Sequence, residues 1–165
     1  VGNGLDPASA IGPLIDDQAR AKVERHVADA VTGGASVLVG GRPAPAGANF
    51  WAPTVLANAR ADMLVAREET FGPVAPLIPF ADEDEVLALA NDTPYGLAAY
   101  FYPRDVGRVW RVAEGLEYGI VGVNDPLPST AQAPFGGVKQ SGLGREGGPT
   151  GIDEYLEEKY VSLAL

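Results

Sequence analysis

Two adjacent carboxylates and an aromatic ring stand together before an apolar segment, in the stretch "REETFGPVAPL" from Arg67 to Leu77. A turn here can present a carboxylate, from Glu68 or Glu69, and the aromatic ring of Phe71 to a ligand. Gly72 and Pro73 make such a turn rigid. These residue types predict a ligand contact at the entrance to a strand. The alternative is a solvated glutamate pair with Phe71 in the core.

The rest of the chain offers few groups for covalent or metal chemistry. It has no cysteine and one histidine, His26, which excludes disulfides, thiolate metal sites and a cysteine nucleophile within this chain. His26 lies among charged residues in "QARAKVERHVADAV", so we expect a solvent-exposed helix position without a role in general acid–base catalysis. No His, Asp or Glu cluster has metal-ligand spacing, and no metal site is predicted. The glycines of "GLGREGG" fit neither a dinucleotide fingerprint nor a phosphate loop.

Charge and hydropathy narrow the class of protein. The 165 residues are 46% hydrophobic with a mean hydropathy of +0.02, which is typical of a globular domain with its own core. Twelve basic against 22 acidic residues give a net charge of −10, so neither nucleic acid nor an anionic membrane surface is an expected partner. No apolar run is long enough for a membrane span, and residues 1–16 lack a secretory signal pattern. We therefore expect a cytoplasmic protein, and an N-terminus made by processing or truncation because residue 1 is valine.

Strand and helix patterns alternate along the chain. Asp16 or Asp17 can cap a helix that runs to about Thr32, where glycines end it. Further helices are predicted at 81–92, capped by Asp82, at 104–117, capped by Asp105, and at 151–158. Strands are predicted at 36–41, 50–59, 74–80, 97–103, 118–124 and 159–165. The strand at 36–41 is expected to be buried. The order favours an α/β fold, with an open, mostly parallel sheet flanked by helices, and ligands at the carboxyl ends of its strands.

Several motifs in this order resemble the aldehyde dehydrogenase superfamily. They are "EETFGPV" and "APFGGVKQSGLGREGG", together with "GNGLDP", "NDTPYGLAAYFY" and "YGIVGVN". The last portion is most similar to succinate-semialdehyde dehydrogenases. The resemblance implies that residues 1–123 are part of the catalytic domain, that 124–150 form a Gly/Pro-rich loop near the active site, and that 151–165 carry a C-terminal helix and an oligomerisation strand.

The resemblance also implies roles for four residues. The carboxylate of Glu69 would accept hydrogen bonds from the nicotinamide ribose of NAD or NADP, and Phe71 would pack beside the nicotinamide. Ser129 would help to hold a substrate carboxylate, although "NDPLPS" departs from the usual family sequence and a plain loop serine is the alternative. Phe135 would line the aldehyde tunnel, with ordinary packing as its alternative.

Other implications concern what this chain does not carry. In the family a cysteine thiolate attacks the aldehyde, hydride passes to NAD(P)+, and a glutamate-activated water hydrolyses the thioester. That cysteine, that glutamate and the nucleotide fingerprint lie N-terminal to the region matched here, so no catalytic residue is assigned. We expect the C-terminal third of a dehydrogenase, inactive alone, which oxidises an aldehyde such as succinate semialdehyde in the complete enzyme. It would form a homo-oligomer through "EKYVSLAL". The alternative is a non-catalytic remnant or assembly module.

Overall fold

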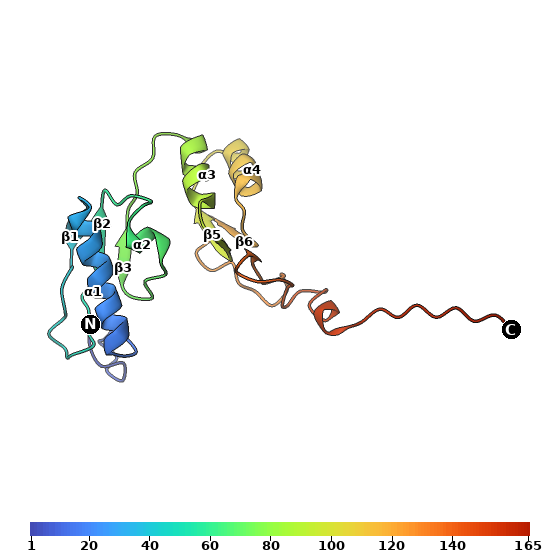
Figure 1. The fold of residues 1–165 in the computed structure, drawn as a ribbon, viewed down its shortest axis with the longest axis horizontal. Coiled ribbons are helices and arrows are strands. Elements are labelled where there is room, and N and C mark those ends of the chain that lie inside the picture. Colours follow the sequence, from blue (N-terminus) through green and yellow to red (C-terminus); the bar gives the residue numbers. More distant parts are fainter. The chain divides into compact units, whose positions relative to one another are not determined.

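The computed structural model describes residues 1–165, which divide into two compact units, residues 1–80 and 81–165. The first segment predicted from the sequence, residues 1–123, therefore spans all of the first unit and the start of the second. Each unit has its own helices and strands (Figure 1). None of the helices combines the length and the apolar character needed to cross a bilayer.

The first unit is built on helix α1, Asp17–Thr32. The Asp16 carboxylate accepts a hydrogen bond from the Ala19 amide at 2.7 Å and so satisfies a free donor of the first turn. Gly33 ends the helix, as the sequence predicts. A second short helix, α2, covers Leu64–Arg67 and has no side-chain cap of its own. Instead, the Asp29 carboxylate of α1 accepts from the Leu64 amide at 2.8 Å, which ties the two helices together.

Three strands complete this unit: β1 (Ser36–Val39), β2 (Thr54–Ala57) and β3 (Val74–Pro76). They form one sheet in the order β1-β2-β3, in which β2 is antiparallel to β1 and parallel to β3. The buried face of α1 shares a core with the central strand and the loops around it, formed by Val23, Val27, Ala30, Ala35, Trp51, Leu56, Ala59, Met63 and Val65. Full burial of a side chain such as Leu56 contributes about 1.5–3 kcal/mol to stability.

Strand β1 differs from its prediction as a buried strand. Its apolar residues Val37, Leu38 and Val39 are 41%, 61% and 56% exposed. None of its residues belongs to the core shared by α1 and β2, so neither face of this outer strand is covered. An apolar sequence predicts burial on both faces only when other elements cover both faces.

The second unit contains a β–α–β arrangement. Strand β5 (Ala98–Phe101) is joined through α4 (Val106–Gly115) to the parallel strand β6 (Ile120–Val123). Helix α3 (Glu83–Asn91) precedes them. The carboxylates of Asp82 and Asp105 cap α3 and α4, as predicted, by accepting from the amides three residues on. A small antiparallel pair, β4 (Tyr95–Gly96) and β7 (Val138–Lys139), brings the Gly/Pro-rich loop back to this unit.

The α/β class is confirmed, with small open sheets and a mixture of parallel and antiparallel pairs. The predicted helix at 151–158 is wrong, because only a 3₁₀ turn at Asp153–Tyr155 forms there. Residues 156–165 form no helix or strand and are exposed (Figure 1). The strand predicted at 159–165 is not formed within the single chain, since an extended segment needs a hydrogen-bonded partner. Its pairing with another subunit stays a prediction.

Candidate functional site

The turn that follows α2 contacts α1 through alternate residues, Glu68, Thr70 and Gly72. His26 of α1 is fully buried, and its Nδ1 lies 3.0 Å from the Thr70 hydroxyl. Its Nε2 lies 3.1 Å from a carboxylate oxygen of Glu68. The prediction of a solvent-exposed His26 is therefore wrong. Charged neighbours along the sequence do not reveal that this one position of the helix faces a distant turn, more than forty residues away.

The proton positions in this cluster follow from the types of group. An ionised carboxylate only accepts hydrogen bonds, so Nε2 of His26 carries a proton and donates to Glu68. In the neutral ring Nδ1 then accepts from the Thr70 hydroxyl. Arg25 also donates to the same Glu68 oxygen at 2.7 Å. The His26 hydrogen bond, helped by the charge of Arg25, holds the pKa of Glu68 below its usual range.

Gly72 continues the same attachment by close packing. A Cβ atom on Gly72 would lie 2.5 Å from Cγ2 of Val23, a fully buried residue of α1. Only glycine allows the backbone to approach the helix this closely. The next residues lead into the sheet, where the Thr54 amide of β2 donates to the Pro73 carbonyl at 2.8 Å. The turn is thus fixed to α1 on one side and to β2 on the other.

Glu69 and Phe71 are the residues left facing outward from this turn. Both are exposed, and the Phe71 ring is 80% accessible. Phe71 also has a left-handed backbone, with φ of 51°, which is uncommon for a residue other than glycine. Both side chains are thus accessible, and their contact with a ligand stays a prediction. Packing of Phe71 in the core of this chain, the alternative, does not occur.

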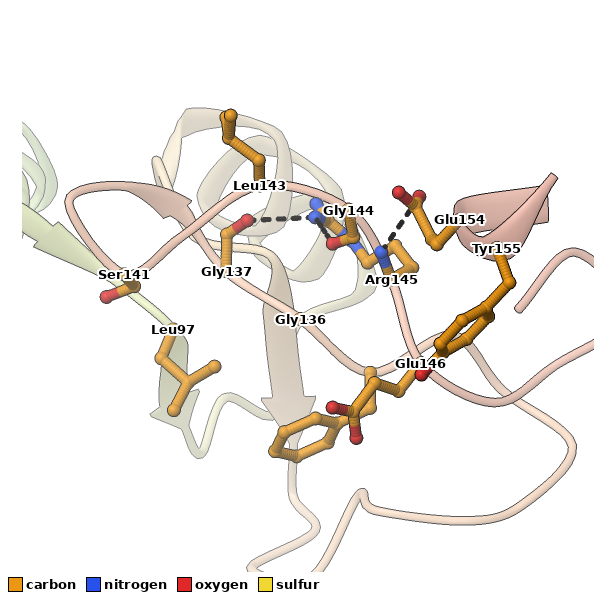
Figure 2. Close-up of a pocket in the computed structure, with 11 residues that line it drawn as sticks. Leu97, Gly136, Gly137, Ser141, Leu143, Gly144, Arg145, Glu146, Glu154 and Tyr155 are labelled. Atoms are coloured by element: carbon orange, nitrogen blue, oxygen red, sulfur yellow. Dashed lines mark hydrogen bonds between the residues drawn. The ribbon is translucent and has the colours of Figure 1, made fainter. Parts of the chain in front are cut away.

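A second candidate site lies in the second unit, where the Gly-rich loop lines an open cavity of about 420 Å³. Figure 2 shows the Arg145 side chain directed at the carbonyls of Gly137 and Gly144, to which its Nη1 donates at 2.8 and 2.7 Å. The Glu154 carboxylate reaches back from the 3₁₀ turn and accepts from the Arg145 amide at 3.2 Å. Arg145 and Glu154 thus hold the loop in a defined shape. No sequence pattern points to this role, because the partners of Arg145 and Glu154 are mostly backbone carbonyls and amides.

The two predicted substrate residues have different positions. Phe135 lines this cavity, and its backbone forms a bridge with Glu146 through two hydrogen bonds of 2.7 Å. Ser129 is exposed and is not among the residues that line the cavity. Among the residues of the structure, no group of three or more His, Cys, Asp or Glu side chains is arranged to hold a metal ion.

The family model described as "Aldehyde dehydrogenase family" matches residues 1–161. The chain belongs to the aldehyde dehydrogenase family. Two curated relatives are similar to it: the succinate-semialdehyde dehydrogenase [NADP(+)] GabD of Escherichia coli strain K12, 57% identical over 165 residues, and the glutarate-semialdehyde dehydrogenase of Pseudomonas aeruginosa PAO1, 56% identical over 163 residues. These alignments cover 100% and 99% of this chain.

The match to aldehyde dehydrogenases also holds in three dimensions. The crystal structure of a succinate-semialdehyde dehydrogenase from Burkholderia pseudomallei superimposes with a TM-score of 0.91 at 59% identity. That superposition covers 94% of this chain and 32% of the crystallised chain. The chain spans about a third of the length of the curated relatives it matches, 34% for each of the two named above.

Proposed function

We propose that this chain serves as the C-terminal part of an NAD(P)-dependent aldehyde dehydrogenase that acts on an aldehyde with a terminal carboxylate, such as succinate semialdehyde. In that enzyme Glu69 and Phe71 bind the nicotinamide end of the cofactor. Phe135 lines the path of the aldehyde, and Ser129 donates a hydrogen bond to the substrate carboxylate. The relative named for succinate semialdehyde also carries NADP+ in its name, which supports the cofactor class.

The observation that carries the proposal is that alternate side chains of the turn have different surroundings. Glu68 and Thr70 are bonded to His26, while Glu69 and Phe71 remain exposed. A free carboxylate beside an exposed ring fits a ribose attached to a flat heterocycle, because the hydroxyls donate and the ring stacks. When bound, the nicotinamide would supply the hydride acceptor. The contribution of these residues is to bind and orient it.

The two residues proposed to contact the aldehyde differ in position. Phe135 lines the cavity of the second unit, whereas Ser129 does not. The two curated relatives, nearly equal in identity, are named for aldehydes that differ by one methylene. A binding site discriminates between two aldehydes that differ by one methylene by only about 1–3 kcal/mol. Similarity to both relatives therefore favours the class of substrate, an aldehyde with a terminal carboxylate, and the comparison of the two aldehydes in the assay below determines the chain length.

This chain has no cysteine and therefore no thiolate nucleophile. We propose that it is inactive by itself. The test is a chimera in which this chain replaces the matching 165 residues of the E. coli relative. The expected result is oxidation of succinate semialdehyde, which is monitored through the absorbance of the reduced nicotinamide. Glutarate semialdehyde is the comparison substrate, and NAD+ is compared with NADP+.

Two controls make the result decisive. The isolated chain with the same substrates is expected to show no reduction of cofactor, and turnover by it would contradict the proposed inactivity. The chimera's circular dichroism spectrum establishes that it is folded. A folded chimera that binds no cofactor and oxidises neither aldehyde would contradict the proposed function.

The C-terminal segment supports a further part of the proposal, a homo-oligomer formed through residues 158–165. Its apolar residues Tyr160, Val161 and Leu163 are 90%, 73% and 76% exposed. Apolar side chains this accessible gain stability by packing against a partner. Light scattering of the chain with and without residues 158–165 tests this directly. We expect association that increases with concentration and is lost on truncation, and a monomer in both cases would refute it. Because the enzyme and the alternative, an assembly module without catalysis, are both expected to associate, the chimera assay separates them: only the enzyme reduces the cofactor.

A further inference from the structure

His26 is the only buried ionisable side chain of the molecule, and the chemistry proposed above does not use it. A polar group buried in a core lowers stability unless it is hydrogen-bonded. On α1 it stands between Val23 and Val27, two buried aliphatic residues of the same core. Packing alone would be served by another aliphatic side chain. The position of an imidazole there therefore calls for an explanation in terms of its two nitrogens.

Both nitrogens are directed at the turn. Nδ1 contacts Thr70 at 3.0 Å and Nε2 contacts Glu68 at 3.1 Å. These two residues flank Glu69, so a single ring fixes the backbone on either side of it. An aliphatic side chain could not do this, and a lysine or arginine could only donate. Imidazole is suited to the task because its neutral form donates from one nitrogen and accepts at the other.

The backbone of Phe71 shows that the turn needs such support. A left-handed phenylalanine persists only where its surroundings hold it. The residue before it is bonded to His26, and the residue after it, Gly72, packs against Val23. Phe71 is thus held from both sides by α1 while its own ring stays exposed.

We infer that His26 is a positioning residue for cofactor binding, which holds Glu68 and Thr70 against α1 so that Glu69 and Phe71 face the nicotinamide ribose. This inference rests on the proposed function of the turn. His26 itself does not touch the cofactor. Its removal is expected to weaken cofactor binding and to leave the recognition of the aldehyde unchanged.

The experiment uses the folded chimera with the E. coli relative and compares four variants. His26→Leu removes both hydrogen bonds, and His26→Gln keeps a donor for Glu68. Thr70→Val removes only the Nδ1 contact, and it tests the role of that contact even if His26→Leu does not fold. Val27→Ala is the matched control, because Val27 is buried on the same helix and the same core at 5% exposure.

The expected result is a split between the two Michaelis constants. His26→Leu is expected to raise the KM for the cofactor about tenfold and to leave the KM for the aldehyde within about twofold. The loss of hydrogen bonds that orient a binding group weakens binding by about tenfold. His26→Gln and Thr70→Val give intermediate increases in the cofactor KM. Val27→Ala lowers stability without the split. An unchanged cofactor KM in His26→Leu and Thr70→Val, or an equal increase in Val27→Ala, overturns the inference.

A second measurement separates this inference from the proposed function. If the parent chimera binds no cofactor, the proposed function fails, and amide hydrogen exchange of the 165-residue chain decides the role of His26. His26→Leu is expected to speed exchange in residues 68–72 at least tenfold more than in β2. Equal acceleration in both segments would show that His26 supports the core in general and does not hold the turn.

Discussion

The close contact between Gly72 and α1 leads to a quantitative prediction for Gly72→Ala. The new Cβ would lie 2.5 Å from Cγ2 of Val23, whereas carbon atoms in contact are normally about 3.5–4.0 Å apart. The gap must therefore open by about 1 Å. Val23 cannot turn aside, because it is fully buried and a β-branched residue in a helix has one strongly preferred rotamer. Gly72 has no left-handed backbone, so alanine adds steric crowding alone.

Overpacking of this kind lowers the free energy of unfolding by about 2 kcal/mol. For a unit of 80 residues, that corresponds to a decrease in Tm of about 10 °C. Val23→Ala alone should lower stability by a similar amount, about 2 kcal/mol, because it removes two buried methyl groups and leaves a cavity. It also removes the atom that alanine at position 72 would meet. The double variant is therefore expected to lose about 2 kcal/mol, about half the sum of the single changes.

Urea unfolding followed by tryptophan fluorescence measures these values. Trp51 lies in the core of the first unit at 2% exposure, and Trp110 is 65% exposed on α4, so Trp110→Phe serves as the parent chain. Gly12→Ala is the control, because nothing lies within 4 Å of its added Cβ. We expect its stability to change by less than about 0.5 kcal/mol. A similarly small effect of Gly72→Ala, or strict additivity in the double variant, would refute the packing argument.

Three further predictions address the two units and the turn. Hydrogen bonds from Arg111 and Arg108 lower the pKa of Glu83 to about 2. The contribution of ionised Glu83 to stability is therefore complete above about pH 4.5 and is lost as the pH falls toward 2. Glu83→Gln should flatten the dependence of the urea midpoint on pH in that window. Gly119→Ala would place a Cβ 1.9 Å from the Gly136 carbonyl oxygen, a backbone atom that cannot move aside. We expect the free energy of unfolding to fall by more than about 3 kcal/mol, as measured by urea unfolding monitored through Trp110 fluorescence. In the chimera, Glu69→Gln removes the charge from the proposed ribose contact, and cofactor titration should show a Kd about tenfold higher. Glu83→Gln with the wild-type acid profile, a stable Gly119→Ala or an unaltered Kd would each contradict its prediction.

The features predicted correctly from the sequence are mostly local ones. The capping carboxylates of Asp16, Asp82 and Asp105 act on amides three residues away, and such contacts depend little on the rest of the fold. Val23, Val27 and Ala30 recur at three- and four-residue steps along α1, and all three lie in the core. The exposure of Phe71 follows from local features as well, since Gly72 and Pro73 limit the backbone beside it, whereas the ligand contact of Glu69 and Phe71 stays a prediction.

The features missed are those that depend on distant partners. Burial of His26 requires the turn to lie against one face of α1, and the exposure of β1 follows because neither face of this outer strand is covered. The β4–β7 pair joins segments more than forty residues apart, through only two residues in each strand. Such short strands carry no periodic signal. The proposed roles of Ser129 and Phe135 come from family resemblance and stay predictions, although Phe135 lies at the cavity.

The alternation within the turn also restricts how this segment can change in evolution. Glu68, Thr70 and Gly72 face α1, while Glu69 and Phe71 face outward. An insertion or deletion of one residue would exchange the two sets, placing the outward carboxylate against His26 and turning its anchor toward solvent. Substitutions of similar shape can be absorbed one at a time, but a change in length cannot. The spacing between these residues should therefore persist through divergence longer than their individual identities.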